Sequence, residues 1–142
     1  MSQTNELEIM ERIALDLEGV EESLASSFNT GAEDFNALIR PLSAAGGKRL
    51  RAQLCLLIAN AGTSVERQRI RIAEAVEMLH LATLIHDDVL DQAEIRRGEE
   101  TIHMHKGNKV AILSGDYLFA KAFQIVSEMP NMKYLQIFSH II

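Results

Sequence analysis

Three aspartates occur within five residues near the middle of the chain: Asp87, Asp88 and Asp91. Residues four apart share one face of a helix, so Asp87 and Asp91 would present their carboxylates one turn apart, with Asp88 beside them. Carboxylates this close repel one another unless a cation neutralises them. Such oxygen ligands suit Mg²⁺, which is bound through one or two carboxylates together with substrate phosphates. The spacing therefore predicts an anion held through a metal.

The alternative for an acidic cluster is a solvated helix face that binds nothing. Here the preceding residues 79–85 are largely apolar, and Arg96 and Arg97 follow closely. Carboxylates at the end of a buried helix that face arginines fit a shared anion better than a wet surface.

A basic stretch precedes the aspartates: Gly46-Gly47-Lys48-Arg49-Leu50-Arg51. Glycines let the backbone approach a ligand closely, and N–H groups at a helix start favour an anion. Lys48 supplies a point charge, and Arg51 a planar fork that suits phosphate oxygens. The alternative is a loop followed by a solvated basic turn. A P-loop is excluded because the glycine spacing is wrong and no strand is expected before it.

Histidines are the remaining candidates. His80 lies seven residues before Asp87, nearly two helical turns, and so on the same stripe as the aspartates. A lone histidine on an apolar helix is usually a core residue, so both interpretations stay open. His86, His103 and His105 lack further ligands at metal-site spacing and are interpreted as structural or loop residues.

Length and composition bound the class of protein. The chain has 142 residues, 47% of them hydrophobic, and a net charge of −6. This suits one domain with a real core and argues against a general nucleic-acid binder. Cys55 is the only cysteine, which excludes an internal disulfide and fits a cytoplasmic location. The polar N-terminus is unlike a secretory signal, and no apolar run approaches ~20 residues, so no membrane span is expected.

The elements that would position these residues are helices. Apolar residues recur at spacings of three and four, as in the run Met10–Phe28, which is typical of amphipathic helices. Pro41 is expected to end one helix and Ser64 to cap another. The sequence predicts an all-α chain in a single partial domain, 1–142, with helices at about 6–28, 33–40, 48–60, 65–90, 108–128 and 132–142. Residues 92–107 are expected to form a loop with a helical turn near 101–105.

Together these segments resemble the trans-isoprenyl diphosphate synthases, especially the bacterial polyprenyl type. Three blocks carry the resemblance: Gly46-Gly47-Lys48 with Arg51, then His80 to Asp91 with Arg96-Arg97-Gly98, then Gly115-Asp116-Tyr117-Leu118. They are similar to the family's basic motif, its first aspartate-rich motif with the trailing arginine pair, and a later segment. The fold implied is an antiparallel helix bundle of the isoprenoid synthase type, of which this chain would be the N-terminal half.

The resemblance implies a reaction and a role for each matching residue. Isopentenyl diphosphate would condense with an allylic diphosphate, with Mg²⁺ as cofactor. The implied catalytic residues are Asp87, Asp88, Asp91 and Arg96, of which Asp87 and Asp91 would bind the metal and Arg96 the allylic diphosphate. The diphosphate of isopentenyl diphosphate would be held by Lys48, Arg51, His80 and Arg97.

Product length is implied by residue size. The turn before Asp87 carries Ala82 and Thr83, with Leu79 deeper. Family members with a bulky ring at this level resemble short-chain enzymes, because the ring closes the path of the growing chain. Small residues here imply a medium or long product.

One feature of the family has no counterpart. A second aspartate-rich motif is expected later in the chain, but Asp116 is the last aspartate and Glu128 is the one acidic residue after it. The chain is then either a catalytic fragment, incomplete by itself, or a partner subunit of a heteromeric synthase. A homodimer or a heteromer is expected. The remaining alternative is an unrelated helical bundle with an acidic surface.

Overall fold

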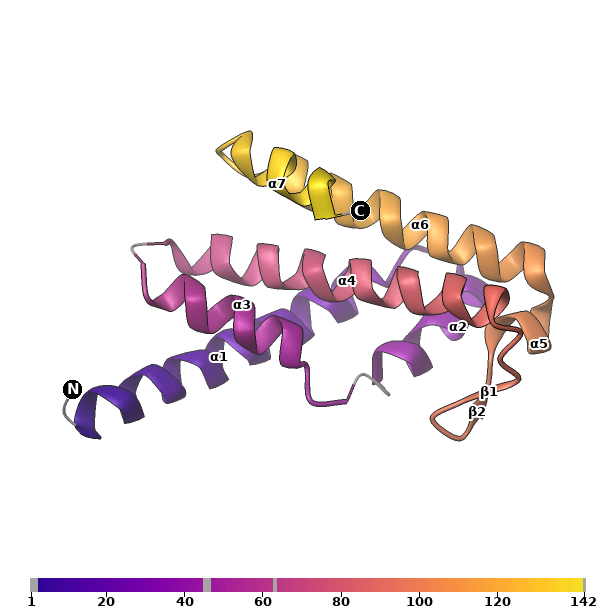
Figure 1. Cartoon of the computed structure of the whole chain (residues 1–142), viewed down its shortest axis with the longest axis horizontal. Coiled ribbons are helices and arrows are strands. Elements are labelled where there is room, and N and C mark those ends of the chain that lie inside the picture. Colours follow the sequence, from indigo (N-terminus) through magenta and orange to yellow (C-terminus); the bar gives the residue numbers. More distant parts are fainter. Residues whose placement is uncertain (1–2, 45–46, 63, 142) are drawn as a thin grey trace.

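The computed structural model describes residues 3–44, 47–62 and 64–141. Over these residues the chain is all-α with one small hairpin, which confirms the predicted fold class (Figure 1). The helices are α1 (Gln3–Ser27), α2 (Glu33–Ala44), α3 (Leu50–Asn60), α4 (Glu66–Leu90), α5 (Ile102–Lys106), α6 (Asn108–Ser127) and α7 (Lys133–Ile141), and the strands are β1 (Ile95–Arg96) and β2 (Glu99–Glu100).

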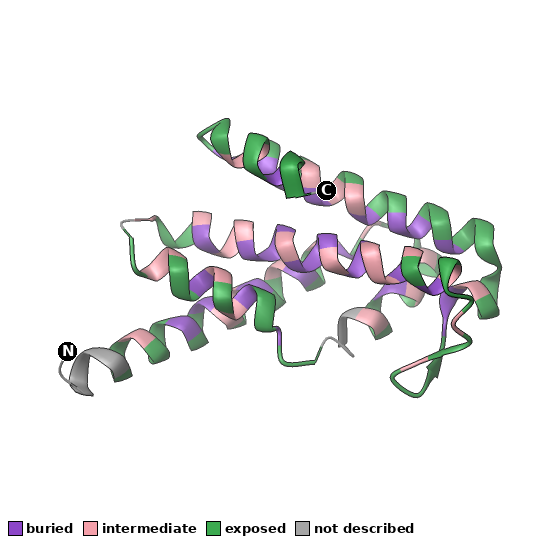
Figure 2. Ribbon diagram, in the orientation of Figure 1, coloured by how far each residue is buried: buried purple, intermediate pink, exposed green. Residues whose placement is uncertain are grey.

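α4 is the central helix and packs against α1, α3 and α6 (Figure 1). Buried positions follow one another along most of its length, as Figure 2 shows. Met78 and Leu81 are among its buried apolar side chains, and each such burial stabilises the fold by roughly 1.5–3 kcal/mol. Its last turn emerges from the core, with Asp87 and Leu90 exposed. The core therefore fixes the helix end that carries the aspartates.

α2 runs to Ala44, beyond the end predicted at residue 40, with Pro41 inside the helix. A proline in a helix interior removes a backbone donor and clashes with the preceding turn, at a cost of about 3 kcal/mol. Ile39 is fully buried, however, and Leu42 packs against the core. Tertiary packing thus overrides the local stop signal, and the added turn places Pro41 and Leu42 on the wall of a cavity.

Two helix starts also differ from the prediction. α3 begins at Leu50 rather than near residue 48, because Arg49 adopts a left-handed conformation with φ 47°. α4 begins at Glu66 with Val65 in the N-cap position, so the prediction of Ser64 as the cap was wrong. The Ser64 hydroxyl instead donates to the carbonyl of Ala59 at 2.7 Å, at the end of α3.

The segment after α4 contains a hairpin that the sequence analysis treated as a loop. β1 pairs antiparallel with β2, with Arg96 opposite Glu99. Arg97 and Gly98 form the turn, with φ of 55° and 89°. Two successive left-handed residues match a type I′ turn. The helical turn expected near 101–105 is α5.

α6 runs along α4, and α7 folds back on α6, where the rings of Phe123 and Phe138 meet edge-on with centroids 5.4 Å apart (Figure 1). In the described part of the chain, α6 is the helix whose length and mean hydropathy of 1.2 alone would let it cross a membrane, which the sequence analysis did not anticipate. A core helix passes the same test, and α6 buries Leu118 and Ile125.

Candidate active site

The last turn of α4 presents two aspartates to solvent. Asp87 and Asp91 are both exposed, and the backbone N–H of Asp91 donates to the Asp87 carbonyl at 2.8 Å. This hydrogen bond closes one helical turn, so the two residues lie on the same face, as their spacing predicts. Two exposed carboxylates one turn apart are a donor set that suits Mg²⁺, which retains water and takes its other ligands from phosphates.

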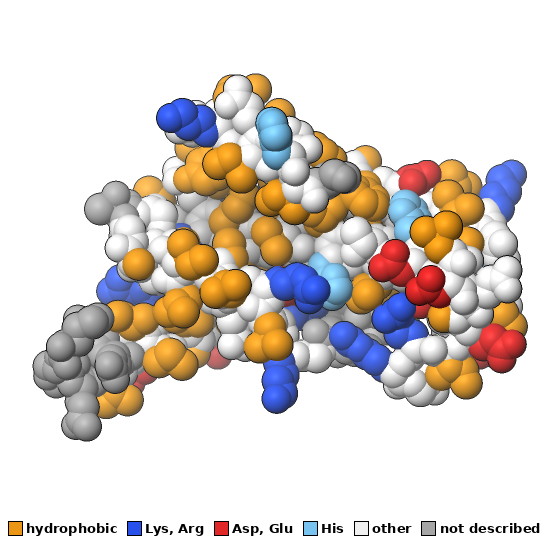
Figure 3. Space-filling view, in the orientation of Figure 1, with side chains coloured by type: hydrophobic (Ala, Val, Ile, Leu, Met, Phe, Trp, Pro, Cys, Tyr) orange, Lys and Arg blue, Asp and Glu red, His pale blue; other side chains and the backbone are white. Residues whose placement is uncertain are grey.

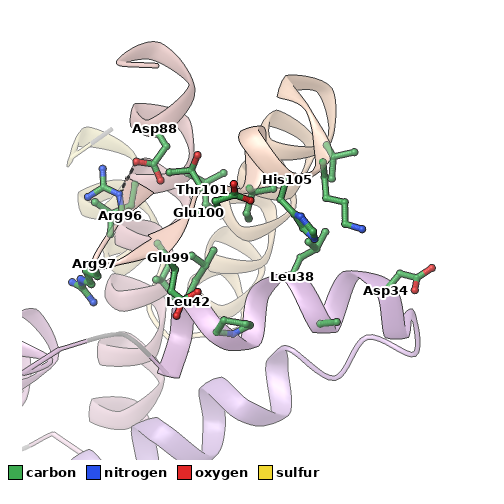
Figure 4. Close-up of a pocket in the computed structure, with 18 residues that line it drawn as sticks. Asp34, Leu38, Leu42, Asp88, Arg96, Arg97, Glu99, Glu100, Thr101 and His105 are labelled. Carbon is green, nitrogen blue, oxygen red and sulfur yellow. Dashed lines mark hydrogen bonds and ion pairs between the residues drawn. The ribbon is translucent and has the colours of Figure 1, made fainter. Parts of the chain in front are cut away.

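Asp88, unlike Asp87 and Asp91, is buried and paired with an arginine. It is 5% exposed, and Arg96 Nε donates to its Oδ1 at 2.6 Å (Figure 4). The guanidinium of Arg96 therefore neutralises Asp88, the one of the three aspartates that was not expected to bind the metal. No three Asp, Glu, His or Cys side chains form a metal cluster within the described residues. The candidate metal ligands are therefore Asp87 and Asp91, while Asp88 orients Arg96.

His80 lies among arginines that come from other elements. Burial is the largest cause that lowers the pKa of His80 below 6.5, and the positive charge of Arg51 is the next. Arg97 and Arg96 lower this pKa further, while Glu77 opposes them. These arginines belong to α3, β1 and the hairpin turn. Figure 3 shows basic, acidic and histidine side chains gathered over the C-terminal half of α4.

The guanidinium of Arg97 lies against Gly47. A Cβ at Gly47 would be 3.7 Å from Arg97 Nη2 and 3.8 Å from Nη1. Both residues are left-handed, with φ of 64° and 55°. Glycine adopts this conformation freely, whereas for an arginine it costs free energy and persists where its surroundings determine it. The contact joins the basic stretch to the hairpin turn, while Gly46 lies outside the described residues.

Lys48 is exposed next to this contact. The side-chain amide of Gln53 donates to the Lys48 carbonyl oxygen at 2.6 Å, which ties the backbone of Lys48 to α3. An exposed ammonium group on a fixed backbone is suited to meet an incoming anion.

A cavity of about 780 Å³ opens beside Asp88 (Figure 4). Leu38 and Leu42 of α2 form one wall, and the hairpin and α5 form others. The wall formed by α4 consists of Leu81, Leu84, Ile85 and Asp88, and the charged lining residues include Arg96, Arg97, Glu99, Glu100 and Lys106. The cavity thus combines an apolar wall with charges of both signs.

The three residues implied in product length lie elsewhere. Ala82 is fully buried and Leu79 nearly so, while Thr83 is half-buried and donates its hydroxyl to the His80 carbonyl at 2.8 Å. None of the three is among the described residues that line the cavity. Their role in product length stays a prediction.

The model of the polyprenyl synthetase family matches residues 32–142. The chain belongs to the polyprenyl synthetase family. The interpretation as an unrelated helical bundle is therefore wrong.

Named members of the family cover almost all of this chain. Octaprenyl diphosphate synthase of Escherichia coli is 33% identical over 134 residues, which are 94% of this chain and 42% of that protein. Heptaprenyl diphosphate synthase component 2 of Geobacillus stearothermophilus is 38% identical, over 89% of this chain and 40% of its own length. The crystal structure of a Caulobacter crescentus polyprenyl synthase, complexed with calcium and isoprenyl diphosphate, matches with a TM-score of 0.84 at 36% identity, over 92% of this chain and 41% of that one. The chain spans less than half the length of these relatives.

In this family member, His86 braces the aspartate helix against α6, which the sequence analysis did not foresee. His86 Nε2 lies 3.1 Å from the Ile112 carbonyl and 3.4 Å from Asp116 Oδ1. Its ring stacks on Phe119 with centroids 5.6 Å apart. A Cβ on Gly115 would overlap the imidazole, so the glycine is what lets the ring approach α6. The sequence contains Gly115-Asp116 as a possible sign of a close contact on α6, but it does not show that His86 is the residue that makes this contact.

His103 and His105 both lie on α5. His103 Nδ1 lies 3.0 Å from the hydroxyl of buried Thr101, at the start of α5. His105 is exposed and lines the cavity.

Gly115→Ala should destabilise the fold by about 1–3 kcal/mol, because the added methyl group forces the His86 ring away from α6. Thermal unfolding measures the change. The double variant Gly115→Ala with His86→Ala removes the overlap and should recover part of the loss. An equal loss in both variants would mean that the contact has no such role.

The pKa of His80 should rise when pyrophosphate binds, because the anion offsets the positive charge of Arg51, Arg96 and Arg97. NMR titration of the imidazole with and without pyrophosphate measures this, and an unchanged pKa would place the anion elsewhere.

Without ligand, the pKa of His80 in the folded chain lies below the ordinary value of a histidine. The unfolded chain therefore binds a proton first as the pH falls, so stability is lost from about pH 6.5 down to the folded-state pKa.

Proposed function

We propose that this chain carries the first half of a polyprenyl diphosphate synthase site, which condenses isopentenyl diphosphate with an allylic diphosphate in Mg²⁺-dependent elongation. One observation carries the proposal: the exposed pair Asp87 and Asp91 shares a helix stripe with His80, while Arg96 is held at 2.6 Å by the neighbouring Asp88 and Arg97 lies against Gly47 of the basic stretch. Carboxylates for a metal beside guanidinium groups for phosphate oxygens suit a metal-bridged diphosphate and a second, metal-free one.

Each residue has a role that follows from its charge. Asp87 and Asp91 would hold Mg²⁺, which when bound would neutralise charge on the leaving diphosphate. Arg96, oriented by Asp88, would bind the allylic diphosphate and stabilise the charge that grows as its C–O bond breaks.

A second group would hold the other substrate, isopentenyl diphosphate: Lys48, Arg51, His80 and Arg97. Its double bond would then attack the allylic cation and form the new C–C bond. The carbocation left by this attack would lose a proton, which restores a double bond in the product. Holding both substrates side by side supplies much of the acceleration, because two separate molecules become one oriented complex.

The site in this chain is incomplete under this proposal. The relatives are more than twice as long, and the expected second aspartate-rich motif has no counterpart here. We expect no prenyl transfer by the chain alone, and activity with a segment or subunit that supplies the missing carboxylates. A medium or long product is supported by the small residues Ala82 and Thr83 and by relatives named octaprenyl and heptaprenyl synthases. A cytoplasmic location is part of the proposal, tested by cell fractionation.

The second candidate is a partner subunit of a heteromeric synthase. The name of the Geobacillus stearothermophilus relative, component 2, favours it. Prenyl transfer that appears after mixing with a second chain would select this alternative if that chain has no activity by itself.

Isothermal titration of the chain with inorganic pyrophosphate, with and without Mg²⁺, tests the proposal. We expect weak binding without metal, through the basic residues, and binding at least about tenfold tighter with Mg²⁺, through Asp87 and Asp91. Binding that does not respond to Mg²⁺, or no binding, would overturn it.

A further inference from the structure

Arg49 is buried in a stretch whose neighbours are exposed. It is 6% exposed, whereas Lys48, Leu50 and Arg51 are all exposed. It also has left-handed backbone angles, φ 47° and ψ 40°, at the N-cap position of α3. A non-glycine residue in this region costs of order 1–3 kcal/mol and persists only where the surroundings hold it. The Arg49 side chain points into the molecule, and the side chains of Lys48, Leu50 and Arg51 are exposed to solvent.

Two carboxylates from different helices hold Arg49. Its Nε and Nη2 donate to Glu21 of α1 at 2.6 and 3.0 Å, in a two-pronged ion pair. Its Nη1 lies 3.6 Å from Oε2 of Glu77, a residue of α4 that is 3% exposed. The other oxygen of Glu77 accepts the backbone N–H of Ala52 at 2.9 Å, in the first turn of α3. The guanidinium therefore ties the start of α3 to both α1 and α4.

Arg49 lies between Lys48 and Arg51 in the chain, so this arrangement is covalently continuous with the basic residues of the candidate site. The Arg49 carbonyl accepts the N–H of Gln53 at 2.9 Å, which opens the helix that carries Arg51. Glu77, which holds Arg49, also acts electrostatically on His80 one turn along α4. A substitution at Arg49 would thus release the backbone of Lys48 and Arg51 without removing a side chain that is expected to meet the anion.

We propose that Arg49 is a positioning residue that fixes the turn from Lys48 to Arg51 and so sets the affinity of the basic site for diphosphate. The inference rests on the proposed function of that site. A lysine cannot replace Arg49, because one ammonium group lacks the planar fork that engages Glu21 twice and reaches Glu77.

The alternative is that Arg49 only stabilises the fold, and the chain contains a matched control. Arg69 of α4 is 8% exposed, and its Nε and Nη2 donate to Asp16 of α1 at 2.9 and 3.2 Å. It too joins two helices through a buried two-pronged ion pair, but near Ser64, whose carbonyl accepts from its Nη1 at 2.8 Å.

The experiment compares pyrophosphate affinity without Mg²⁺ and thermal unfolding for the chain, R49M and R69M. Both variants should lose stability, but R49M should bind about tenfold more weakly while R69M stays within about twofold of the unaltered chain. Equal affinities of R49M and R69M would overturn the inference and leave the proposed function intact. Absence of binding by the unaltered chain would overturn the metal-free diphosphate site and the inference with it.

E21Q is the milder variant, because Glu21 is 47% exposed and the change leaves the buried Arg49–Glu77 pair in place. It should remain folded and bind pyrophosphate about threefold more weakly. A folded E21Q with unchanged affinity, when R49M is too unstable to measure, would also overturn the inference.

Discussion

Replacing Asp87 and Asp91 together by asparagine should abolish the Mg²⁺-dependent part of pyrophosphate binding, a loss of at least about tenfold in affinity when Mg²⁺ is present. Asparagine keeps the size of each side chain but removes the negative charge that holds a hard divalent cation. Both residues are exposed, so the fold and the Mg²⁺-independent binding should change little. Titration calorimetry with and without Mg²⁺ separates the two parts.

The control is a carboxylate pair of the same spacing at another place. Glu18 and Glu22 are both exposed and four residues apart on α1. Changing both to glutamine alters net charge by the same amount as the aspartate variant and should leave the Mg²⁺ response intact. An equal loss in the two double variants would reduce the effect to net charge and remove the metal site.

Arg96→Met should lower the free energy of unfolding by roughly 2–3 kcal/mol, because it leaves the carboxylate of Asp88 buried without its partner. The loss is smaller than for a fully buried pair, since the Arg96 side chain is 33% exposed and water reaches one side of it. The same variant should weaken binding of the allylic diphosphate. Chemical denaturation measures the stability.

Adding Asp88→Asn to Arg96→Met removes the unpaired charge and should restore about half or more of the lost stability. Diphosphate affinity should not recover, because the guanidinium is still absent. Recovery of both properties would mean that Arg96 neutralises Asp88 and has no contact with substrate.

The residues that share a helix stripe were predictable from the sequence. Asp87, Asp91 and His80 are related by spacings of four and seven, and the helical period alone puts them on one face. The all-α class followed in the same way from apolar periodicity. The basic residues were found by type, but the contact of Arg97 with Gly47 and the pairing of Arg96 with Asp88 needed the fold.

Partners distant in sequence could not be predicted. Asp88 reaches Arg96 because the chain reverses just after α4, where Gln92 has φ 52° and the N–H of Ala93 donates to the Asp88 carbonyl at 3.0 Å. The hairpin itself was also missed, because Arg97-Gly98 is not the usual Asn-Gly signal for a type I′ turn. Arg49 looked like one more surface cation, yet Glu21 and Glu77, 28 residues away on each side, hold it inside the molecule.

α2 gives the same lesson for local structure. The proline rule is correct on average, but the burial of Ile39 outweighs it at Pro41. Tertiary contacts of this kind decide where a marginal helix ends.

Manganese-induced line broadening tests the central claim most directly, because Mn²⁺ replaces Mg²⁺ at oxygen ligands and broadens NMR signals of nearby nuclei. With pyrophosphate present, Mn²⁺ should broaden the signals of Asp87 and Asp91 first, and those of Glu18 and Glu22 should stay sharp. Equal broadening at both carboxylate pairs, or the same broadening of Asp87 and Asp91 with and without pyrophosphate, would contradict a metal-bridged diphosphate at the end of α4.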